Sequence, residues 1–289
     1  MTIKQALDEA ALALNVSDSP RLDAEMLLAH VLEVERSYLF THPELQLSDD
    51  SLRLFQSYVA RRAQSEPIAY LLGSKAFWDF ELTVNSHVLV PRPETELLVE
   101  TALEIAQERP EQDQTLSVAD LGTGSGAIAL ALAKERPSWQ VLAVDISPEA
   151  LAVARENAKI LALKNVEFVL GSWCDALGVA SLDMIVANPP YIAPGDRHLG
   201  EGDLPFEPTL ALEAEDDGFA AFNSIADAAR QHLRPGGWLL LEHGFEQQKQ
   251  LEALLLELGY ATVSGHQDLA GCDRLVAAQW GQAQELASG

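Results

Sequence analysis

The sequence predicts an α/β fold: helices cover both faces of a mostly parallel sheet that ends in an antiparallel strand, preceded by a small helical domain and a β-hairpin linker. Three observations lead to this expectation. From Ser117 onward, short apolar runs alternate with helical patterns, which is typical of a parallel sheet. Before residue 73 the apolar periodicity is helical throughout. The last two extended runs follow each other without a crossover helix, so they must pair antiparallel.

The length of 289 residues exceeds what one small core usually holds, so we expect a large domain and a small one. The pattern changes place a helical domain at 1–73, a hairpin linker at 74–92 and the sheet domain at 93–289. No apolar run approaches the length of a membrane span, and the amino terminus lacks the layout of a secretory signal. Cys174 and Cys272 lie far apart without metal-ligand spacing. We therefore expect a cytoplasmic monomer without membrane contact, disulfides or a metal site.

The charge balance bears on partners. Acidic residues number 44 against 19 Lys and Arg, which gives a formal net charge of −25. Binding to phosphate backbones draws on clustered basic residues, so we expect no nucleic-acid partner. A basic protein partner would be favoured, although an acidic surface can also serve solubility alone.

The helical domain is predicted from three apolar stripes. The first covers residues 3–14, Ser19-Pro20 supplies an N-cap and a proline at the first position of the second helix, and a third helix begins at Ser48. His30 and His42 lie on an apolar face and in a turn, and we interpret both as structural. The domain shows no catalytic constellation.

The next segment changes to a period of two. Residues 77–89 alternate as strands do, and Asn85-Ser86 stands where a hairpin turn belongs. The hairpin delivers Pro91-Arg92-Pro93-Glu94 to the start of a helix that runs to Arg109-Pro110. Arg92 and Glu94 are either part of a charged helix start or, because two prolines stiffen the entry, part of a substrate-binding loop.

The elements of the sheet domain follow in order. Five strands are expected at 117–121, 140–146, 166–170, 182–187 and 238–242, and the antiparallel pair at 262–268 and 274–279. Helices are expected at 127–136 and 148–163, from 219 to 233 with Pro235-Gly236-Gly237 as the stop, and before Gly259.

A glycine-rich loop follows the first strand. Asp120-Leu121-Gly122-Thr123-Gly124-Ser125-Gly126 lies between that strand and its helix, where backbone N–H groups face a ligand. Asp145 ends the second strand, placed to accept hydrogen bonds from a ribose diol. The loop alone does not separate NAD from other nucleoside ligands, and a plain glycine turn is the alternative without a ligand.

The fourth strand ends in Asn188-Pro189-Pro190-Tyr191. The two prolines force the backbone out of the sheet, at the carboxyl edge where α/β sheets bind ligands. They also remove two N–H donors, so the carbonyls and the Asn188 amide oxygen form a rigid row of acceptors. Such a row suits a substrate that presents an NH₂ group, and Tyr191 adds a flat face beside it. The alternative is that Pro-Pro only terminates the strand.

Taken together, these motifs resemble those of S-adenosylmethionine-dependent amino-group methyltransferases, with their Rossmann-like sheet. The chain is most similar to the protein-(glutamine-N5) methyltransferases of the PrmC/HemK type, which modify peptide-chain release factors. The likeness covers nearly the whole chain. Its further motifs are Ser19-Pro20-Arg21-Leu22-Asp23-Ala24-Glu25, Val90-Pro91-Arg92-Pro93-Glu94-Thr95-Glu96 and Glu207-Pro208-x-x-Ala211-Leu212.

The resemblance implies a role for each matched position. Asp145 would hold the ribose of S-adenosylmethionine, and Trp173 would flank the adenine unless it only fills the core. Ser172 departs from the acidic residue that the family often has there. The substrate would be the glutamine of the Gly-Gly-Gln motif of release factors, and its methylation would modulate translation termination. The methionine part of the cofactor would lie on Gly122, Thr123, Gly124, Ser125, Gly126 and Asn188; Asn188, Pro189 and Tyr191 would be catalytic; and Asn188, Pro189, Pro190, Tyr191, Arg92 and Glu94 would bind substrate.

The chemistry follows from a poor nucleophile. The lone pair of a glutamine amide nitrogen is delocalised into the carbonyl, so the nitrogen attacks a methyl group only when that conjugation is reduced. The Asn188 side-chain oxygen and the Pro189 carbonyl can each accept one amide proton and orient the nitrogen. No strong base is required.

Three alternatives remain open from the sequence. An adenine-N6 methyltransferase of DNA or RNA shares the Asn-Pro-Pro-Tyr motif, but it needs a surface that holds phosphates. A cofactor-binding adaptor without activity has no need of an intact Asn188 and Tyr191. A NAD dehydrogenase has no use for the Asn-Pro-Pro-Tyr edge or the terminal antiparallel pair.

Overall fold

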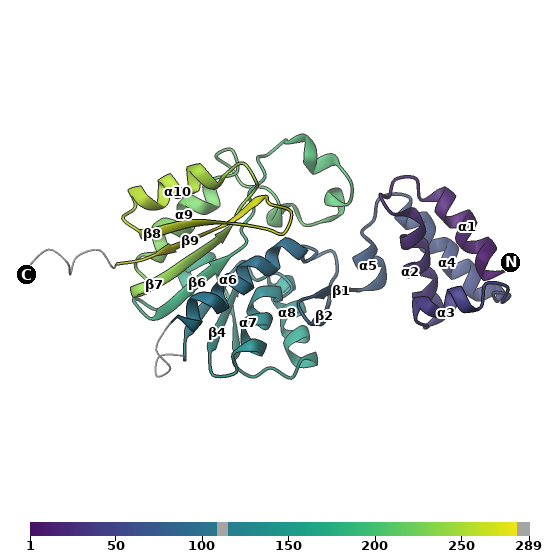
Figure 1. Cartoon of the computed structure of the whole chain (residues 1–289), viewed down its shortest axis with the longest axis horizontal. Coiled ribbons are helices and arrows are strands. Elements are labelled where there is room, and N and C mark those ends of the chain that lie inside the picture. Colours follow the sequence, from purple (N-terminus) through teal and green to yellow (C-terminus); the bar gives the residue numbers. More distant parts are fainter. Residues whose placement is uncertain (109–114, 282–289) are drawn as a thin grey trace, which may run out of the picture. The chain divides into compact units, whose positions relative to one another are not determined.

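The computed structural model describes residues 1–108 and 115–281. The described chain forms two compact units (Figure 1). The expected helix end at Arg109-Pro110 and the last eight residues of the expected sheet domain lie outside the described residues. The smaller unit takes in a segment from the middle of the chain that the limits expected from the sequence leave out. Its ranges are Met1–Lys75, Val84–Ser86 and Arg197–Glu207, and those of the larger unit are Ala76–Thr83, His87–Asp196 and Pro208–Gly289.

The smaller unit is built from helices around an apolar core. Thr2 caps the first helix in a reciprocal capping box with Gln5, which satisfies two N–H groups at the helix start. Ser48 caps α4 as the sequence predicts, whereas Ser19 makes no side-chain cap although Pro20 does open α2. Two short helices, α3 and α5, were not predicted. The helices are α1 (Ile3–Ala13), α2 (Pro20–Leu32), α3 (Arg36–Thr41), α4 (Asp49–Arg62) and α5 (Ile68–Leu72).

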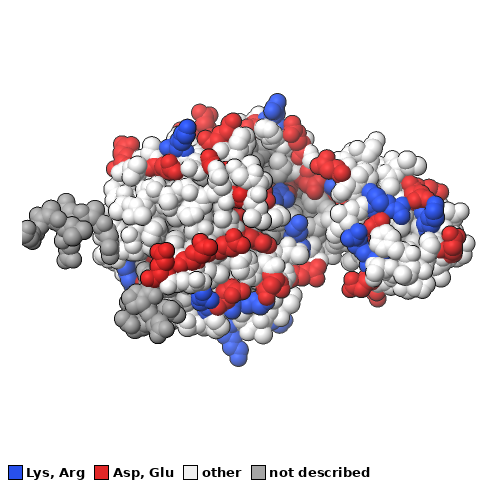
Figure 2. Space-filling model, in the orientation of Figure 1, with Lys and Arg blue, Asp and Glu red and all other residues white. Residues whose placement is uncertain are grey.

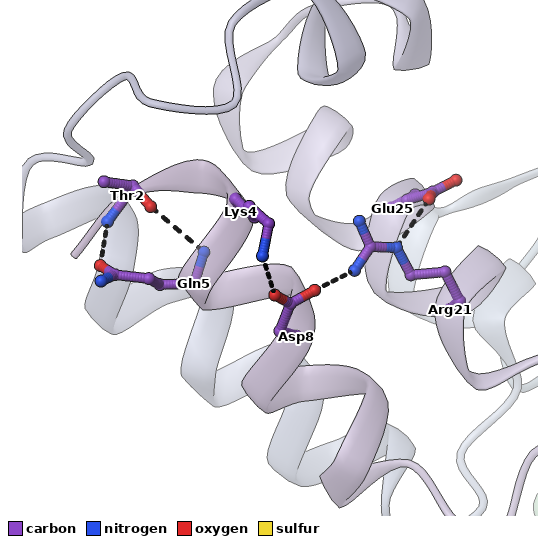
Figure 3. A network of polar contacts seen from close by, with 6 residues as sticks. All are labelled: Thr2, Lys4, Gln5, Asp8, Arg21 and Glu25. Carbon is purple, nitrogen blue, oxygen red and sulfur yellow. Dashed lines mark hydrogen bonds and ion pairs between the residues drawn. The ribbon is translucent and has the colours of Figure 1, made fainter.

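An ion-pair network joins the first helices of this unit (Figure 3). Asp8 on α1 accepts hydrogen bonds from Lys4 at 2.8 Å and from Arg21 on α2 at 2.7 Å. Glu25 accepts from Arg21 at 2.9 Å and from Arg36 at 2.8 Å. Most of these side chains are exposed, so the network orders the surface more than it stabilises the fold.

A second network is buried. The Arg62 side chain on α4 donates through Nε to Asp23 on α2 at 2.7 Å. Through Nη1 it donates to Asp203 at 2.5 Å and to the Glu66 carbonyl at 3.1 Å. Arg62 is 8% exposed and Asp23 is 6% exposed, so this pair lies inside the unit. Arg62 thus ties segment 197–207 to two helices far from it in sequence.

The hairpin has its turn earlier than the sequence predicts. Strand β1 spans Ser74–Phe77 and β2 spans Phe80–Thr83, so the turn lies at Trp78-Asp79 and the expectation of Asn85-Ser86 was wrong. Trp78 adopts a left-handed φ of 57°. Its backbone N–H donates to Glu96 at 2.8 Å and its ring N–H to Glu135 at 2.9 Å. These tertiary bonds select the turn and outweigh local turn propensity.

The larger unit contains a seven-stranded sheet with the order β5-β4-β3-β6-β7-β9-β8. Strands β3 to β7 pair parallel, and β9 pairs antiparallel with both β7 and β8, as predicted. The strand order reverses next to β3, and the crevice at such a switch point is where α/β sheets bind ligands. The strands are β3 (Ser117–Leu121), β4 (Gln140–Asp145), β5 (Val166–Leu170), β6 (Leu182–Ala187), β7 (Leu233–Glu242), β8 (Ala261–Gln267) and β9 (Asp273–Gln279).

Helices lie on both faces of this sheet (Figure 1). Phe222 of α9 and Leu251 of α10 pack into one core cluster with alternate residues of the strands, among them Ile185 and Leu239. Helices α6, α7 and α8 pack against the sheet on the other side. The helices are α6 (Glu96–Gln107), α7 (Ala127–Glu135), α8 (Pro148–Ile160), α9 (Ala220–Ala229) and α10 (Gln248–Glu257), with 3₁₀ turns at Pro93–Thr95, Trp173–Ala176, Arg197–Gly200, Leu204–Phe206 and Thr209–Ala211.

One helix end differs from the sequence expectation. Helix α9 ends at Ala229, and Pro235-Gly236-Gly237 lies inside β7, so this segment does not stop the helix. Leu233 already pairs with Leu182 of β6, and a register shift follows before Trp238 pairs with Met184. The irregular residues are absorbed as a bulge in the strand.

The surface reflects the charge of the chain. Figure 2 shows acidic side chains gathered in a band across the larger unit on the face in view.

Within residues 1–108 and 115–281, no helix has both the length and the apolar character that a membrane crossing needs.

Candidate active site

The glycine loop leaves β3 at the carboxyl edge of the sheet. The backbone N–H groups of Gly122 and Thr123 donate to the Val144 carbonyl of β4 at 2.8 and 2.9 Å. Gly124 has a left-handed φ of 56°, and a Cβ there would meet no atom within 4 Å. A ligand can therefore approach the main chain at Gly124 closely.

Asp120 connects this loop to α7 through two hydrogen bonds. Its Oδ2 accepts a hydrogen bond from the Thr123 hydroxyl at 2.6 Å and one from the Ala129 N–H at 3.1 Å. The residue is fully buried, and burial raises the pKa of its carboxyl to about 7. Sequence reasoning assigned Asp120 no role, although an acidic residue within a buried strand was a signal for one.

Asp145 lies beside the loop, at the end of β4. Its Oδ2 accepts from the Gly124 N–H at 2.8 Å, and its Oδ1 accepts from the Ser147 N–H at 2.9 Å. Each carboxylate oxygen can accept a further bond, so the side chain remains able to receive a diol. Asp145 thus connects the predicted ribose site to the glycine loop directly.

Trp173 packs against the core and also lies against the glycine loop. It begins the 3₁₀ turn after β5 with a φ of 45° and packs against the core cluster of the sheet. Its ring also lies against the loop, because a Cβ on Gly122 would come within 3.3 Å of it. The indole fills the core on one side and faces the loop on the other.

The Asn-Pro-Pro-Tyr segment leaves the neighbouring strand at the same edge. Every residue of β6 is buried, which confirms the predicted central strand. The backbone beyond it is fixed by two contacts: Gln247 donates to the Tyr191 carbonyl at 3.1 Å, and the Ile192 N–H donates to the Leu212 carbonyl at 3.0 Å. The exit from the strand is therefore held by distant parts of the chain.

Asn188 has partners that sequence reasoning missed. Its Nδ2 donates to the Thr95 hydroxyl at 3.2 Å, and Thr95 stands at the start of α6. Both residues are hydrogen-bonded to Glu242, the last residue of β7. Burial raises the pKa of Glu242 to about 7. Thr95 lies in the Val90–Glu96 motif, in which sequence reasoning gave it no role, and Glu242 lies in none of the motifs quoted from the sequence, so only the fold reveals their contacts with Asn188.

Arg92 and Glu94 lie near this edge. Burial raises the pKa of the Tyr191 hydroxyl, and the charges of Glu242, Arg274, Glu94 and Arg92 also act on it. The two residues predicted to bind substrate are thus within electrostatic range of Tyr191.

The sheet register brings the motifs together. Leu121 pairs with Val144 on one side and with Ala187 on the other. The glycine loop, Asp145 and Asn188 therefore follow three adjacent strands, β3, β4 and β6, and leave the sheet at one edge.

Comparison with known proteins decides the family. Residues 5–73 match the model of the PrmC N-terminal domain, and residues 112–286 match that of a methyltransferase domain. The release factor glutamine methyltransferase of Aliivibrio fischeri is 47% identical over 271 residues, 93% of this chain and 94% of its own. That of Escherichia coli is 42% identical and covers 98% of this chain and 100% of its own. The chain belongs to the release factor glutamine methyltransferases.

Solved structures confirm the fold of this methyltransferase. A methyltransferase from Pyrococcus furiosus superimposes with a TM-score of 0.53 at 19% identity and covers 78% of this chain and 99% of its own. The 16S rRNA N2 G1207 methyltransferase of T. thermophilus, solved with AdoMet and guanosine, gives a TM-score of 0.51 at 22% identity over 72% of this chain and 49% of its own. At these identities the likeness concerns the Rossmann-like fold alone.

The methyltransferase uses S-adenosylmethionine, and the loop residues fit this group. The space over Gly124 is open, and the backbone of the loop is fixed by Asp120 and Asp145. We propose that Gly122–Gly126 hold the methionine part, Asp145 the ribose hydroxyls and Trp173 the adenine. When bound, the cofactor supplies an electrophilic methyl group on a sulfonium centre.

Replacing Asp145 by alanine should weaken binding of S-adenosylmethionine by about 1.5–3 kcal/mol, the range for hydrogen bonds to a charged group. The variant loses the diol acceptor and the bond that fixes the Gly124 N–H. Isothermal titration calorimetry measures the effect. Asp183→Ala, which removes a buried carboxylate at the amino end of β6, is the matched control and should leave affinity unchanged. Equal affinities of wild type and Asp145→Ala would remove Asp145 from the site.

Proposed function

We propose that this enzyme methylates the side-chain amide nitrogen (N5) of the glutamine in the Gly-Gly-Gln motif of peptide-chain release factors, and so modulates translation termination. The observation that carries the proposal is the position of Asn188. The Asn188 amide nitrogen donates a hydrogen bond to Thr95. Asn188 directly follows β6, which pairs with β3, the strand that leads into the glycine loop. An acceptor for an amide proton thus stands beside the cofactor loop.

The chain's own residues orient the nucleophile. The Asn188 side-chain oxygen and the Pro189 carbonyl each accept one proton of the glutamine amide, which turns the nitrogen lone pair toward the methyl group. The same two oxygens stabilise the positive charge that develops on nitrogen. The amide proton leaves during or after the transfer, so no catalytic Asp, His or Cys is required next to Asn188. Tyr191 offers a flat face for the amide plane, and Arg92 and Glu94 contact the flanking backbone of the substrate.

The partner is a protein rather than a nucleic acid. The net charge of −25 disfavours phosphate backbones and favours a partner with a basic surface. We propose that the enzyme acts as a monomer in the cytoplasm, where translation takes place.

Incubation with labelled S-adenosylmethionine tests the function directly. Purified release factors and, in parallel, DNA and RNA are offered as substrates, and mass mapping locates the modified residue. We expect label on the glutamine of the Gly-Gly-Gln motif and none on nucleic acid. Label on adenine alone would replace this function by adenine-N6 methylation.

We further propose that the helical domain docks the protein substrate. It contributes no residue to the cofactor loop, and its family model matches residues 5–73. Deleting residues 1–72 should spare cofactor binding and lower methylation of intact release factor about tenfold or more, the effect of losing 1.4 kcal/mol of docking free energy. A short Gly-Gly-Gln peptide is the control substrate, because it has nothing to dock. Undiminished activity on the intact factor would exclude the docking role.

A further inference from the structure

Glu242 stands beside Asn188 at the carboxyl edge of the sheet. Ala187 of β6 pairs with Leu241 of β7, so Asn188 and Glu242 are the next residues along two adjacent parallel strands. Thr95 reaches the same point from the start of α6. Three segments that are far apart in the sequence therefore meet around one amide group.

The hydrogen bonds determine which way the Asn188 amide faces. An ionised carboxylate can only accept, so the Asn188 group that faces Glu242 is the NH₂ and not the oxygen. The second hydrogen of this NH₂ goes to the Thr95 hydroxyl at 3.2 Å, and Thr95 in turn is hydrogen-bonded to Glu242. We refer to Thr95, Asn188 and Glu242 as the triad. Because both amide hydrogens of Asn188 are engaged by Glu242 and Thr95, the Asn188 oxygen is the group that faces away from these two residues.

The position of Glu242 is costly for the fold. Glu242 is 2% exposed, and among the described residues its Oε2 has no hydrogen-bond partner. Burying a carboxylate with one oxygen unsatisfied destabilises the folded chain, and such groups are retained mainly where they serve a site.

We propose that Glu242 is a positioning residue that, with Thr95, fixes the Asn188 carboxamide so that its oxygen faces the substrate amide. The inference rests on the catalytic role of Asn188 proposed above. The triad selects a substrate that donates N–H groups to Asn188, because the opposite orientation of the Asn188 amide would place its oxygen against the Glu242 carboxylate.

The charge state of Glu242 gives this role a pH dependence. The titratable and charged groups that face it are Glu94 from the turn before α6, Arg274 from β9 and the Tyr191 hydroxyl. Burial raises the pKa of Glu242 to about 7, so below that pH the carboxyl is protonated. A protonated carboxyl can donate to the Asn188 oxygen, and the amide then has two competing orientations. Turnover should therefore rise as pH increases through about 7.

Single-turnover methyl transfer to release factor tests the proposal. Glu242→Ala should lower the rate by a factor on the order of 10–10², the size expected when a reacting group is misplaced. Glu242→Gln should lose less, because its amide oxygen can still accept, and its rate should no longer change with pH near 7. Calorimetry with S-adenosylmethionine should give wild-type affinity for both variants. Asp183→Asn, which alters a buried carboxylate at the other end of β6, should keep the wild-type rate and pH profile.

The double variant Asn188→Ala/Glu242→Gln distinguishes the positioning role of Glu242 from the catalytic role of Asn188, on which it rests. If Glu242 acts through Asn188, adding Glu242→Gln to Asn188→Ala should not lower the rate of methyl transfer any further. The positioning role would be overturned if the rate losses of the two single variants multiplied in the double variant. It would also be overturned if Glu242→Gln kept the rate and pH profile of the wild type. Either result would leave Asn188 catalytic. An Asn188→Ala variant with the wild-type rate would instead overturn the proposed function. Loss of cofactor affinity in step with turnover would show that Glu242 is only structural.

Discussion

Replacing Asn188 by alanine should lower the rate of methyl transfer by a factor on the order of 10²–10³, as removal of one preorganised electrostatic contact does elsewhere. The variant lacks the acceptor that orients the substrate amide and stabilises charge on its nitrogen. Single-turnover kinetics at saturating cofactor and substrate isolate this step from binding. Cofactor affinity should fall only modestly.

Two further variants sharpen the result. Asn188→Asp keeps an acceptor of similar size but loses the NH₂ that donates to Thr95 and brings a second carboxylate next to Glu242, so it should also lose turnover. Asn165→Ala is the matched control: its Nδ2 donates to the Ala133 carbonyl at 3.0 Å near the opposite end of the sheet. It should affect stability and not turnover. A wild-type rate in Asn188→Ala would mean that Asn-Pro-Pro-Tyr only terminates the strand.

The central part of the site could be predicted because its motifs directly follow strands that the sequence makes recognisable. Continuous apolar runs such as 182–187 mark buried parallel strands, and each motif directly follows such a run. The sequence predicts that Gly122 and Asn188 each follow the carboxyl end of a parallel strand, and the observed pairing of β3 with β6 then brings the two together. The antiparallel pair at the end was predictable for the same reason, since its short connection allows only one direction.

The residues around Asn188 could not be predicted, because their roles depend on contacts between distant segments. Thr95 and Glu242 lie in different parts of the chain, and neither shows a spacing that indicates chemistry. The predicted position of the hairpin turn was wrong for a related reason. Glu96 and Glu135 accept hydrogen bonds that hold Trp78 in the turn, and the local turn propensity of Asn85-Ser86 does not compete with these contacts. Segment 197–207 belongs to the smaller unit, where Asp203 accepts a hydrogen bond from Arg62, and no pattern in the sequence indicates this long-range contact.

Replacing Arg62 by alanine should lower the free energy of unfolding of the smaller unit by about 3–5 kcal/mol, the cost of breaking a buried ion pair by removing one partner. Asp23 would be left buried without its cation. Asp203 would also lose its bond to Arg62, so backbone amides in segment 197–207 should exchange hydrogen faster than in the wild type. Urea unfolding measures the first effect, and hydrogen-exchange mass spectrometry measures the second.

An exposed pair on the same helix provides the control for Arg62. Arg53 pairs with Asp50 on the surface of α4, and Arg53→Ala should cost less than about 1 kcal/mol. In Arg62→Leu/Asp23→Leu both charges are gone, so much of the lost stability should return, because apolar replacement of a buried pair is often neutral. Segment 197–207 should still exchange fast in that variant, since Asp203 remains without Arg62. Normal exchange there would mean that other contacts hold the segment, and the Arg62–Asp203 bond would then have no ordering role.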